Sequence, residues 1–276
     1  MEHTGIMRKE AERPDFRFLS ATALKLLAAA LMLLDHIHQM FAAAGAPMWL
    51  TMAGRLVFPI FLFTASESFS HTRSKKKYLK RLLIASWGMT VFTFVLQNLA
   101  PNENVVLMNN AFSTFFAAGL YMLAWDCLEK GVREKRPGQI FRAVLYGLIP
   151  IVSALPLLAV AMLSFNENVP GIVIRLLAAV SLLLPSIFSA EGGVAMIALG
   201  ALFYVFRKRR SVQIAVLLLL SAAVYVVDGG VQWMMWLACI PIVLYNGERG
   251  RGMKYFFYIF YPAHIGLLYL ISAFVL

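Results

Sequence analysis

Charged residues and cysteines are scarce in this 276-residue sequence. Charged residues make up 14% of the chain and hydrophobic residues 61%, whereas a soluble domain is about a quarter charged and about half apolar. This shortage of charge excludes an ordinary soluble domain and indicates that lipid is the solvent. The two cysteines, Cys127 and Cys239, lie in separate apolar segments and suggest neither a disulfide framework nor a metal site.

Several other features are missing. Residues 1–20 are polar and contain no apolar core of a signal peptide, so we expect a cytosolic N-terminal segment there. The rest of the chain shows no internal repeat, no low-complexity stretch and no soluble domain. We therefore expect residues 21–276 to form one integral-membrane domain.

Apolar runs are what the sequence has in abundance. A helix of about 20 apolar residues crosses the hydrocarbon core of a bilayer, and many of the runs approach that length. The sequence therefore predicts an all-α, polytopic transmembrane bundle. Its ten apolar runs cover residues 21–43, 50–70, 79–99, 107–128, 140–163, 171–188, 192–206, 212–228, 231–246 and 254–275.

The distribution of positive charge sets the expected topology. The net charge of +11 comes from Lys and Arg in short loops between apolar runs, which is typical of membrane topology rather than of nucleic-acid binding. Ten spans would place the basic cluster at 207–210 outside the cell. If the short run 171–188, with Arg175 and Pro185, is re-entrant, nine spans place that cluster and residues 249–254 in the cytosol. We expect this nine-span cell-membrane protein, with Leu276 external, and keep ten spans as the alternative.

Ionisable residues inside spans are costly and therefore mark candidate functional sites. The first predicted span contains Asp35, His36 and His38 within four residues. Asp35 and His38 are three apart and share a helix face. Lys25 precedes His36 by eleven residues, close to three turns, so the two share a stripe about 16 Å apart along the axis.

The remaining embedded polar residues fall at three depths. Arg55, Asn110 and Glu191 lie toward the outer side, where we expect them to join Asp35 and His36. His264 lies near mid-membrane, where it could form a second site with His38 and Asn110. Cations that could hold an anionic donor gather on the cytosolic side, namely Lys25, His71, Arg73, Lys76 and Lys77.

Several stretches, in combination and in order, resemble the TraX family of membrane proteins. They are spread over most of residues 23–268. They comprise Leu24-Lys25, Asp35-His36-Ile37, Gly54-Arg55-Leu56-Val57-Phe58-Pro59-Ile60-Phe61, Glu67-Ser68-Phe69, His71-Thr72-Arg73, Tyr78, Glu191-Gly192-Gly193, Tyr245-Asn246-Gly247, Lys254-Tyr255-Phe256-Phe257-Tyr258 and Tyr261-Pro262-Ala263-His264.

The resemblance implies an activity but no residue-by-residue mechanism. The TraX family is named for a conjugation protein that acetylates the N-terminus of pilin, with acetyl-CoA as the expected donor. The ten residues between Lys25 and His36 are also similar to a basic-X10-His pattern in membrane acyltransferases that modify sugars and lipids. Both resemblances favour acyl transfer, with a protein, lipid or glycan as the acceptor.

Our first hypothesis is thus an acetyl-CoA-dependent membrane acyltransferase without a resident cofactor or metal. His36 would be the general base, because imidazole titrates near neutral pH. Asp35 or Glu191 would orient or stabilise a histidine, and Arg55 or Asn110 would stabilise the oxyanion. No Ser or Cys stands out as a nucleophile, so direct transfer is favoured over an acyl-histidine.

Two alternatives come from other classes of protein. A proton-coupled transporter or flippase would use Asp35, His36, His38 and Glu191 as a relay or substrate site. A non-catalytic conjugation or envelope scaffold would tolerate loss of the polar cluster. The sequence offers one plausibly broken segment, at 171–188, and no inverted repeat in favour of transport.

Overall fold

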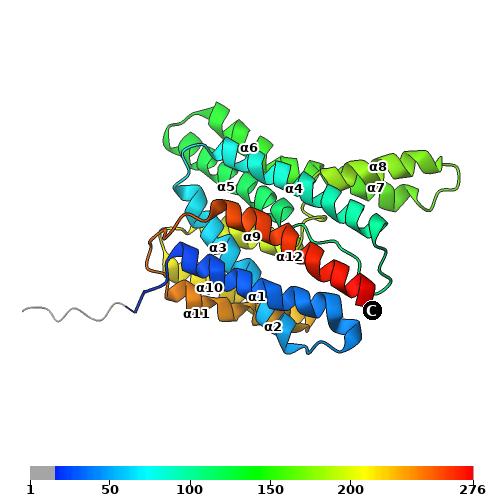
Figure 1. Ribbon diagram of the computed structural model, residues 1–276. Helices are drawn as coiled ribbons and strands as arrows, with labels where there is room; N and C mark the ends of the chain where they lie inside the picture. Colours follow the sequence, from blue (N-terminus) through cyan, green and yellow to red (C-terminus); the bar gives the residue numbers. More distant parts are fainter. Residues whose placement is uncertain (1–15, 276) are drawn as a thin grey trace, which may run out of the picture.

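The computed structural model describes residues 16–275, and Figure 1 shows the arrangement of its helices. Within that part of the chain every regular element is helical, and an isolated bridge joins Leu19 to Tyr245. The all-α class expected from the sequence is confirmed. Most of the predicted N-terminal segment 1–20, as well as Leu276, lies outside the described residues.

The helices follow one another with short connections. In chain order they are α1 Ala21–Phe41, η1 Ala42–Ala44, α2 Trp49–Gly54, α3 Val57–Ser70, α4 Lys75–Leu99, α5 Ala111–Arg133, α6 Pro137–Val152, α7 Leu155–Leu163, α8 Gly171–Leu183, α9 Gly193–Val205, α10 Arg210–Asp228, η2 Val231–Ala238, α11 Cys239–Val243 and α12 Lys254–Val275.

Seven helices in the described residues are long and apolar enough to cross a membrane. These spans fit the multi-pass membrane protein expected from composition. They are Ala21–Ala44, Trp49–Ser70, Lys75–Leu99, Ala111–Arg133, Pro137–Leu163, Arg210–Asp228 and Tyr255–Val275.

Three of the ten predicted runs form shorter helices, so nine full-length spans are not confirmed. The run 171–188 is short, as expected, and forms Gly171–Leu183. The runs 192–206 and 231–246, expected to span, form only Gly193–Val205 and Val231–Val243. Backbone conformation limits α9, because Gly192, its N-cap, and Gly193, its first residue, both have positive φ. The run 231–246 begins as the eight-residue 3₁₀ helix η2, which rises about 2.0 Å per residue instead of 1.5 Å.

The ends of the bundle differ in their connections (Figure 1). The start of α1 and the connections before α4, α6 and α12 lie at one end. The connection between α1 and α2 and the end of α12 lie at the other, and α7 and α8 project beyond it as a hairpin. The basic segments at 73–77, 133–136 and 249–251 therefore share an end, hereafter the basic end.

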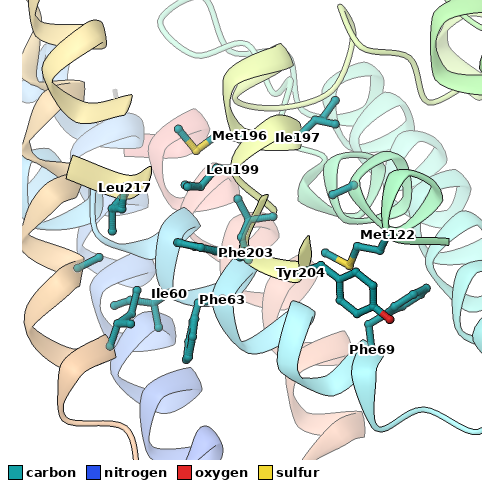
Figure 2. Packing of buried hydrophobic residues seen from close by; sticks show 14 of the residues in the cluster. Ile60, Phe63, Phe69, Met122, Met196, Ile197, Leu199, Phe203, Tyr204 and Leu217 are labelled. Atoms are coloured by element: carbon teal, nitrogen blue, oxygen red, sulfur yellow. The ribbon is translucent and has the colours of Figure 1, made fainter. Parts of the chain in front are cut away.

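Helix α3 lies at the centre of the larger apolar core (Figure 2). Its Phe63 packs edge-on against Phe203 of α9 with ring centroids 5.9 Å apart, and Phe69 packs on Tyr204 at 5.3 Å. Ala117 and Ala118 of α5 are fully buried in the same cluster. Because lipid is as apolar as these side chains, close packing stabilises the contacts rather than exclusion from water. Helix α3 thereby holds α1, α5 and α9 around one interior space.

A second apolar cluster places α12 against α1 and α4. It contains Met32 and Met40 of α1, Met89 of α4, and Tyr261 and Tyr269 of α12. The Tyr269 hydroxyl donates to the Ala100 carbonyl at 2.9 Å, which fixes the C-terminal part of α12. The packing brings residues more than two hundred positions apart into the contacts described next.

Candidate functional site

A cavity of about 730 Å³ runs between the helices, within the size range of small-molecule sites. One part is lined by Asp35, His36, Arg55 and Glu191, hereafter the polar end of the cavity. The other part, at the basic end of the bundle, is lined by Lys25, His71, Arg81, Arg249 and Arg251. Aromatic side chains line the space between, namely Phe58, Phe61, Phe112, Phe115, Phe257 and Phe260.

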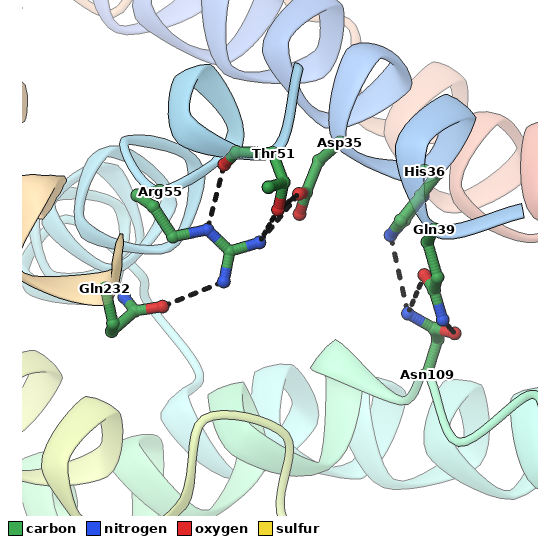
Figure 3. Close-up of polar contacts among 7 residues, drawn as sticks. All are labelled: Asp35, His36, Gln39, Thr51, Arg55, Asn109 and Gln232. Carbon is green, nitrogen blue, oxygen red and sulfur yellow. Dashed lines mark hydrogen bonds and ion pairs between the residues drawn. The ribbon is translucent and has the colours of Figure 1, made fainter. Parts of the chain in front are cut away.

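Arg55 organises the polar end (Figure 3). Its Nη2 pairs with Asp35 Oδ1 at 2.6 Å, and its Nη1 donates to Gln232 Oε1 at 2.9 Å. Its Nε donates to the Thr51 carbonyl at 3.0 Å, and Nη2 also reaches Thr51 Oγ1 at 2.9 Å. Thr51 Oγ1 in turn donates to Asp35 at 2.7 Å. Asp35 is therefore the ionic partner of Arg55, and neither histidine of the first helix contacts it in these bonds.

This pairing depends on a close approach of two helices at Gly54. A Cβ added at Gly54 would lie 2.3 Å from the Cβ of Asp35, so a larger side chain does not fit. The missing side chain lets α2 lie against α1, and Arg55, the next residue, then reaches Asp35. Glycine at this position is thus a packing requirement of the polar end.

His36 contacts a second histidine in the interior. Its Nδ1 lies 2.6 Å from Nε2 of His264, and both side chains are buried. The rings lie nearly parallel, with centroids 4.8 Å apart. The Nδ1 atom of His264 lies 2.5 Å from the Phe260 carbonyl oxygen, one turn earlier on α12.

The hydrogen-bond pattern assigns the tautomer of both rings. A carbonyl oxygen only accepts, so Nδ1 of His264 carries the proton and its Nε2 is an acceptor. Nδ1 of His36 must then donate to that nitrogen, which leaves Nε2 of His36 unprotonated and able to accept. The pair therefore presents one basic nitrogen, at His36 Nε2, while both rings remain neutral.

An amide pair lies against that basic nitrogen. Asn109 Nδ2 is 3.4 Å from His36 Nε2, and it also donates to Gln39 Oε1 at 3.1 Å. Gln39 Nε2 returns a bond to Asn109 Oδ1 at 2.9 Å (Figure 3). The contact to His36 is the longest of the three, so a substrate group could replace it at low cost. Gln39 was missed in the sequence, although it lies three residues after His36 on a shared helix face.

Glu191 lies in the linker between α8 and α9 and lines the cavity. Its Oε2 accepts from the backbone amide of Asn110 at 2.9 Å and from the Tyr261 hydroxyl at 3.0 Å. Burial raises the pKa of the Glu191 carboxyl to about 7, and the nearby charge of Asp35 acts in the same direction. This carboxyl therefore changes charge near neutral pH.

Asn110 has a structural role at the start of α5. Its Oδ1 caps the helix by accepting from the Ser113 amide at 3.3 Å. Its Nδ2 donates to the carbonyl and hydroxyl of Ser86 and to the Thr90 hydroxyl, each at 3.1 Å. Since these bonds occupy the side chain, Asn110 is not free to contact a substrate.

The other predicted site residues divide into those that line the cavity and those that do not. Lys25 and His71 line it, and Lys25 Nζ donates to Ser68 Oγ at 3.3 Å. Arg73, Lys76 and Lys77 are exposed and absent from the lining. His38 also lies away from the lining, and His264 stands behind His36. Arg81, Arg249 and Arg251 are cavity residues that the site prediction did not include.

Comparison with known proteins supports one family. A family model described as TraX protein matches residues 20–272. The chain is also 28% identical over 265 residues to a protein described as probable fimbrial assembly protein FimC, serogroup H1, from Dichelobacter nodosus. That alignment covers 90% of this chain and 94% of the relative. No solved structure matches.

Proposed function

Because the chain belongs to the TraX protein family, we propose that it is a membrane acyltransferase that uses acyl-CoA. The group transferred is acetyl, the donor binds from the cytosol, and the acceptor is an amine or hydroxyl of an envelope-associated molecule. The relative described as a fimbrial assembly protein favours a pilus-type protein as that acceptor.

One observation carries the proposal. A single cavity contains both the cationic residues of the basic end and the imidazole of His36. CoA is a polyanion that does not cross a bilayer, so its phosphates need cations on the side from which it enters. The aromatic stretch between the two ends suits an uncharged arm and excludes water from the thioester.

The proposed reaction needs one base and no covalent intermediate. His36 Nε2 accepts a proton from the acceptor amine as its nitrogen attacks the thioester carbonyl. The C–S bond then breaks, the amide forms, and the proton passes from His36 to the CoA thiolate. The products are the acylated acceptor and free CoA, and His36 returns to its neutral form.

His264 acts as a positioning residue in this scheme. Its Nε2 accepts from His36 Nδ1, which leaves Nε2 of His36, beside Asn109, as the basic nitrogen. When His36 takes up a proton, the same bond becomes charge-assisted and stronger. His264 thus stabilises the transient imidazolium without contacting the substrate.

Of the two residues expected to stabilise the oxyanion, Arg55 and Asn110, Arg55 is the better candidate. A guanidinium has five N–H donors, and the bonds to Thr51, Gln232 and Asp35 use four of them. One Nη1 donor remains for a developing negative charge in the cavity. The side-chain amide of Asn110 has no comparable free donor, because its Nδ2 already donates to Ser86 and Thr90.

The test is acyl transfer by the purified protein in detergent. We expect His36→Ala to lower turnover from acetyl-CoA to a peptide amine by about 10²- to 10⁴-fold, the usual effect of losing a general base. CoA affinity and the melting temperature should stay close to those of the wild type. His38→Ala is the matched control, because His38 lies off the cavity lining. Full activity in His36→Ala, or loss of activity only through unfolding, would contradict the assignment.

One structural feature supports transport as the second candidate function. The break between α8 and α9 places Glu191 beside the cavity, as broken helices do in secondary transporters. Proton flux in liposomes that requires Glu191, without hydrolysis or transfer from acetyl-CoA, would favour that reading.

A further inference from the structure

Four cations meet at the basic end of the cavity, hereafter the cation cluster. Lys25 comes from α1, Arg81 from α4, and Arg249 and Arg251 from the loop before α12. Three separate parts of the chain thus direct positive charge to one space. Arg249 is close enough to Lys25 for the two charges to repel each other.

The loop that carries the two arginines is fixed in place by α1. The amides of Ala21 and Thr22 donate to the carbonyls of Glu248 and Arg249 at 2.8 and 3.2 Å. The Thr22 hydroxyl contacts the carbonyls of Arg249 and Arg251 at 3.0 and 2.6 Å. Gly247 and Gly250 supply the positive φ angles that the turn requires. The first amides of α1 therefore hold the rim of the cavity in a defined shape.

The charge of the cluster is poorly balanced by the chain itself. Within residues 16–275, the ion pairs between side chains involve none of its four members. Glu67 lines the same part of the cavity and lies near His71 and Arg210. His71 adds a titratable group there, and the acids Asp35 and Glu191 lie at the polar end. Lys25 is partly buried, and a partly buried cation without a counter-charge is costly, so an anionic ligand would remove a cost there. Arg81, Arg249 and Arg251 are exposed and line the open part of the same cavity.

The distance from the cluster to His36 favours an anionic ligand with an arm as long as that of CoA. Lys25 and His36 are eleven residues apart on α1, an axial rise of about 16 Å. The main chain of a pantetheine arm is as long as about four extended residues, or roughly 14 Å. A phosphate held at Lys25 would thus place a thioester beside the basic nitrogen of His36.

We propose that Lys25, Arg81, Arg249 and Arg251 form the phosphate-binding site for the CoA part of the donor. The inference rests on the proposed function, and it assigns donor binding to these cavity residues rather than to Arg73, Lys76 and Lys77, which are absent from the lining. The shared chemistry is an organic phosphate, which CoA or a lipid headgroup could supply.

Direct binding of CoA, without an acceptor, tests the site. We would measure its affinity in a maltoside detergent for the wild type, Lys25→Gln and the double variant Arg249→Gln/Arg251→Gln. Charge-assisted bonds to phosphate are strong, so each of the two variants should bind CoA about tenfold more weakly or worse. Adenosine 3′,5′-bisphosphate, which lacks the arm, should lose affinity in the same variants.

The exposed loop provides the matched control. The triple variant Arg73→Gln/Lys76→Gln/Lys77→Gln removes more charges than either cluster variant but none from the cavity lining. Its CoA affinity should therefore stay within about twofold at moderate salt. Equal weakening in this control, or unchanged affinity in both cluster variants, would overturn the inference. Binding of phosphatidylglycerol that is lost in both cluster variants, by a wild type that does not bind CoA, would assign the cluster to a lipid headgroup and overturn the CoA assignment.

The binding result and the proposed function can fail separately. Acyl transfer that persists while the cluster variants keep wild-type CoA affinity contradicts the site and leaves the acyltransferase. Cluster-dependent CoA binding by a protein that transfers no acyl group contradicts the acyltransferase and leaves the site. Melting temperatures in the absence of CoA identify any variant that has simply lost its fold.

Discussion

At the scale of single residues, the interior is defined by which hydrogen bonds each polar group makes. Phe260, through its carbonyl oxygen, fixes the proton of His264, and His264 fixes that of His36. A backbone atom of α12 thereby determines which nitrogen of α1 is basic. The consequence can be tested at His264, which touches neither donor nor acceptor in the proposed reaction.

His264→Leu should lower turnover by about tenfold or more with little change in the KM for acetyl-CoA, because it removes the acceptor that aligns and stabilises His36. His264→Gln should recover part of the loss, since its Oε1 can still accept from His36 Nδ1. Steady-state kinetics on both variants would decide. Equal activity of the Leu and Gln variants would show that His264 only fills space.

The raised pKa of Glu191 makes a second residue-scale prediction. A carboxyl with a raised folded-state pKa favours folding at low pH, and this contribution is lost as pH rises through the folded value. The pH window for this loss runs from the ordinary carboxyl pKa of 4.5 to the raised pKa of about 7. The melting temperature in detergent should therefore fall between pH 5 and pH 8, by an amount that Glu191 controls. Glu191→Gln, whose amide oxygen can accept the same bonds, should melt with a flatter dependence on pH.

At the scale of helices, close contacts decide where the spans sit. The approach of α2 to α1 at Gly54 leaves no room for even one methyl group. The exposed position Gly88 in α4, by contrast, has nothing within 4 Å of an added Cβ. These two helical glycines form a matched pair for testing the packing.

Gly54→Ala should destabilise the protein by about 1–3 kcal/mol, the usual cost of overpacking, and should disturb the contact between Arg55 and Asp35. Gly88→Ala should be neutral or slightly stabilising, because alanine is the better helix former. Thermal unfolding of both variants in the same detergent measures the difference. Similar melting temperatures for the two would mean that α2 can move away from α1 without cost.

At the scale of the whole molecule, the basic segments share one end of the bundle, and the positive-inside rule predicts that this end faces the cytosol. With Cys127 and Cys239 replaced by serine, single cysteines at Lys208 and Arg251 should react with an impermeant maleimide only after the membrane is opened. A cysteine at Glu167, in the α7–α8 connection, should react in intact cells. Labelling of position 208 from outside would contradict this topology and favour either the reverse orientation or ten spans.

The sequence predicted the class of the molecule better than the partners of its polar residues. Apolar runs located every long helix, because hydropathy is a local property. The contacts of Asp35 with Arg55 and of His36 with His264 join residues 20 and 228 positions apart, and only tertiary packing sets them. The lengths of α9 and η2 were misjudged for a related reason, since a hydropathy window does not register the positive φ of Gly192 and Gly193 or a 3₁₀ backbone.

The 3₁₀ conformation of η2 has a mechanical consequence for the polar end. Eight residues of 3₁₀ helix are about 16 Å long, and the same residues as α-helix are about 12 Å long. Gln232 lies in the first turn of η2 and holds Nη1 of Arg55. Recoiling of η2 into an α-helix would shorten it by about 4 Å and turn Gln232 about the helix axis. That change would free a second N–H donor of Arg55, so the conformation of η2 would set how many hydrogen bonds Arg55 can donate into the cavity.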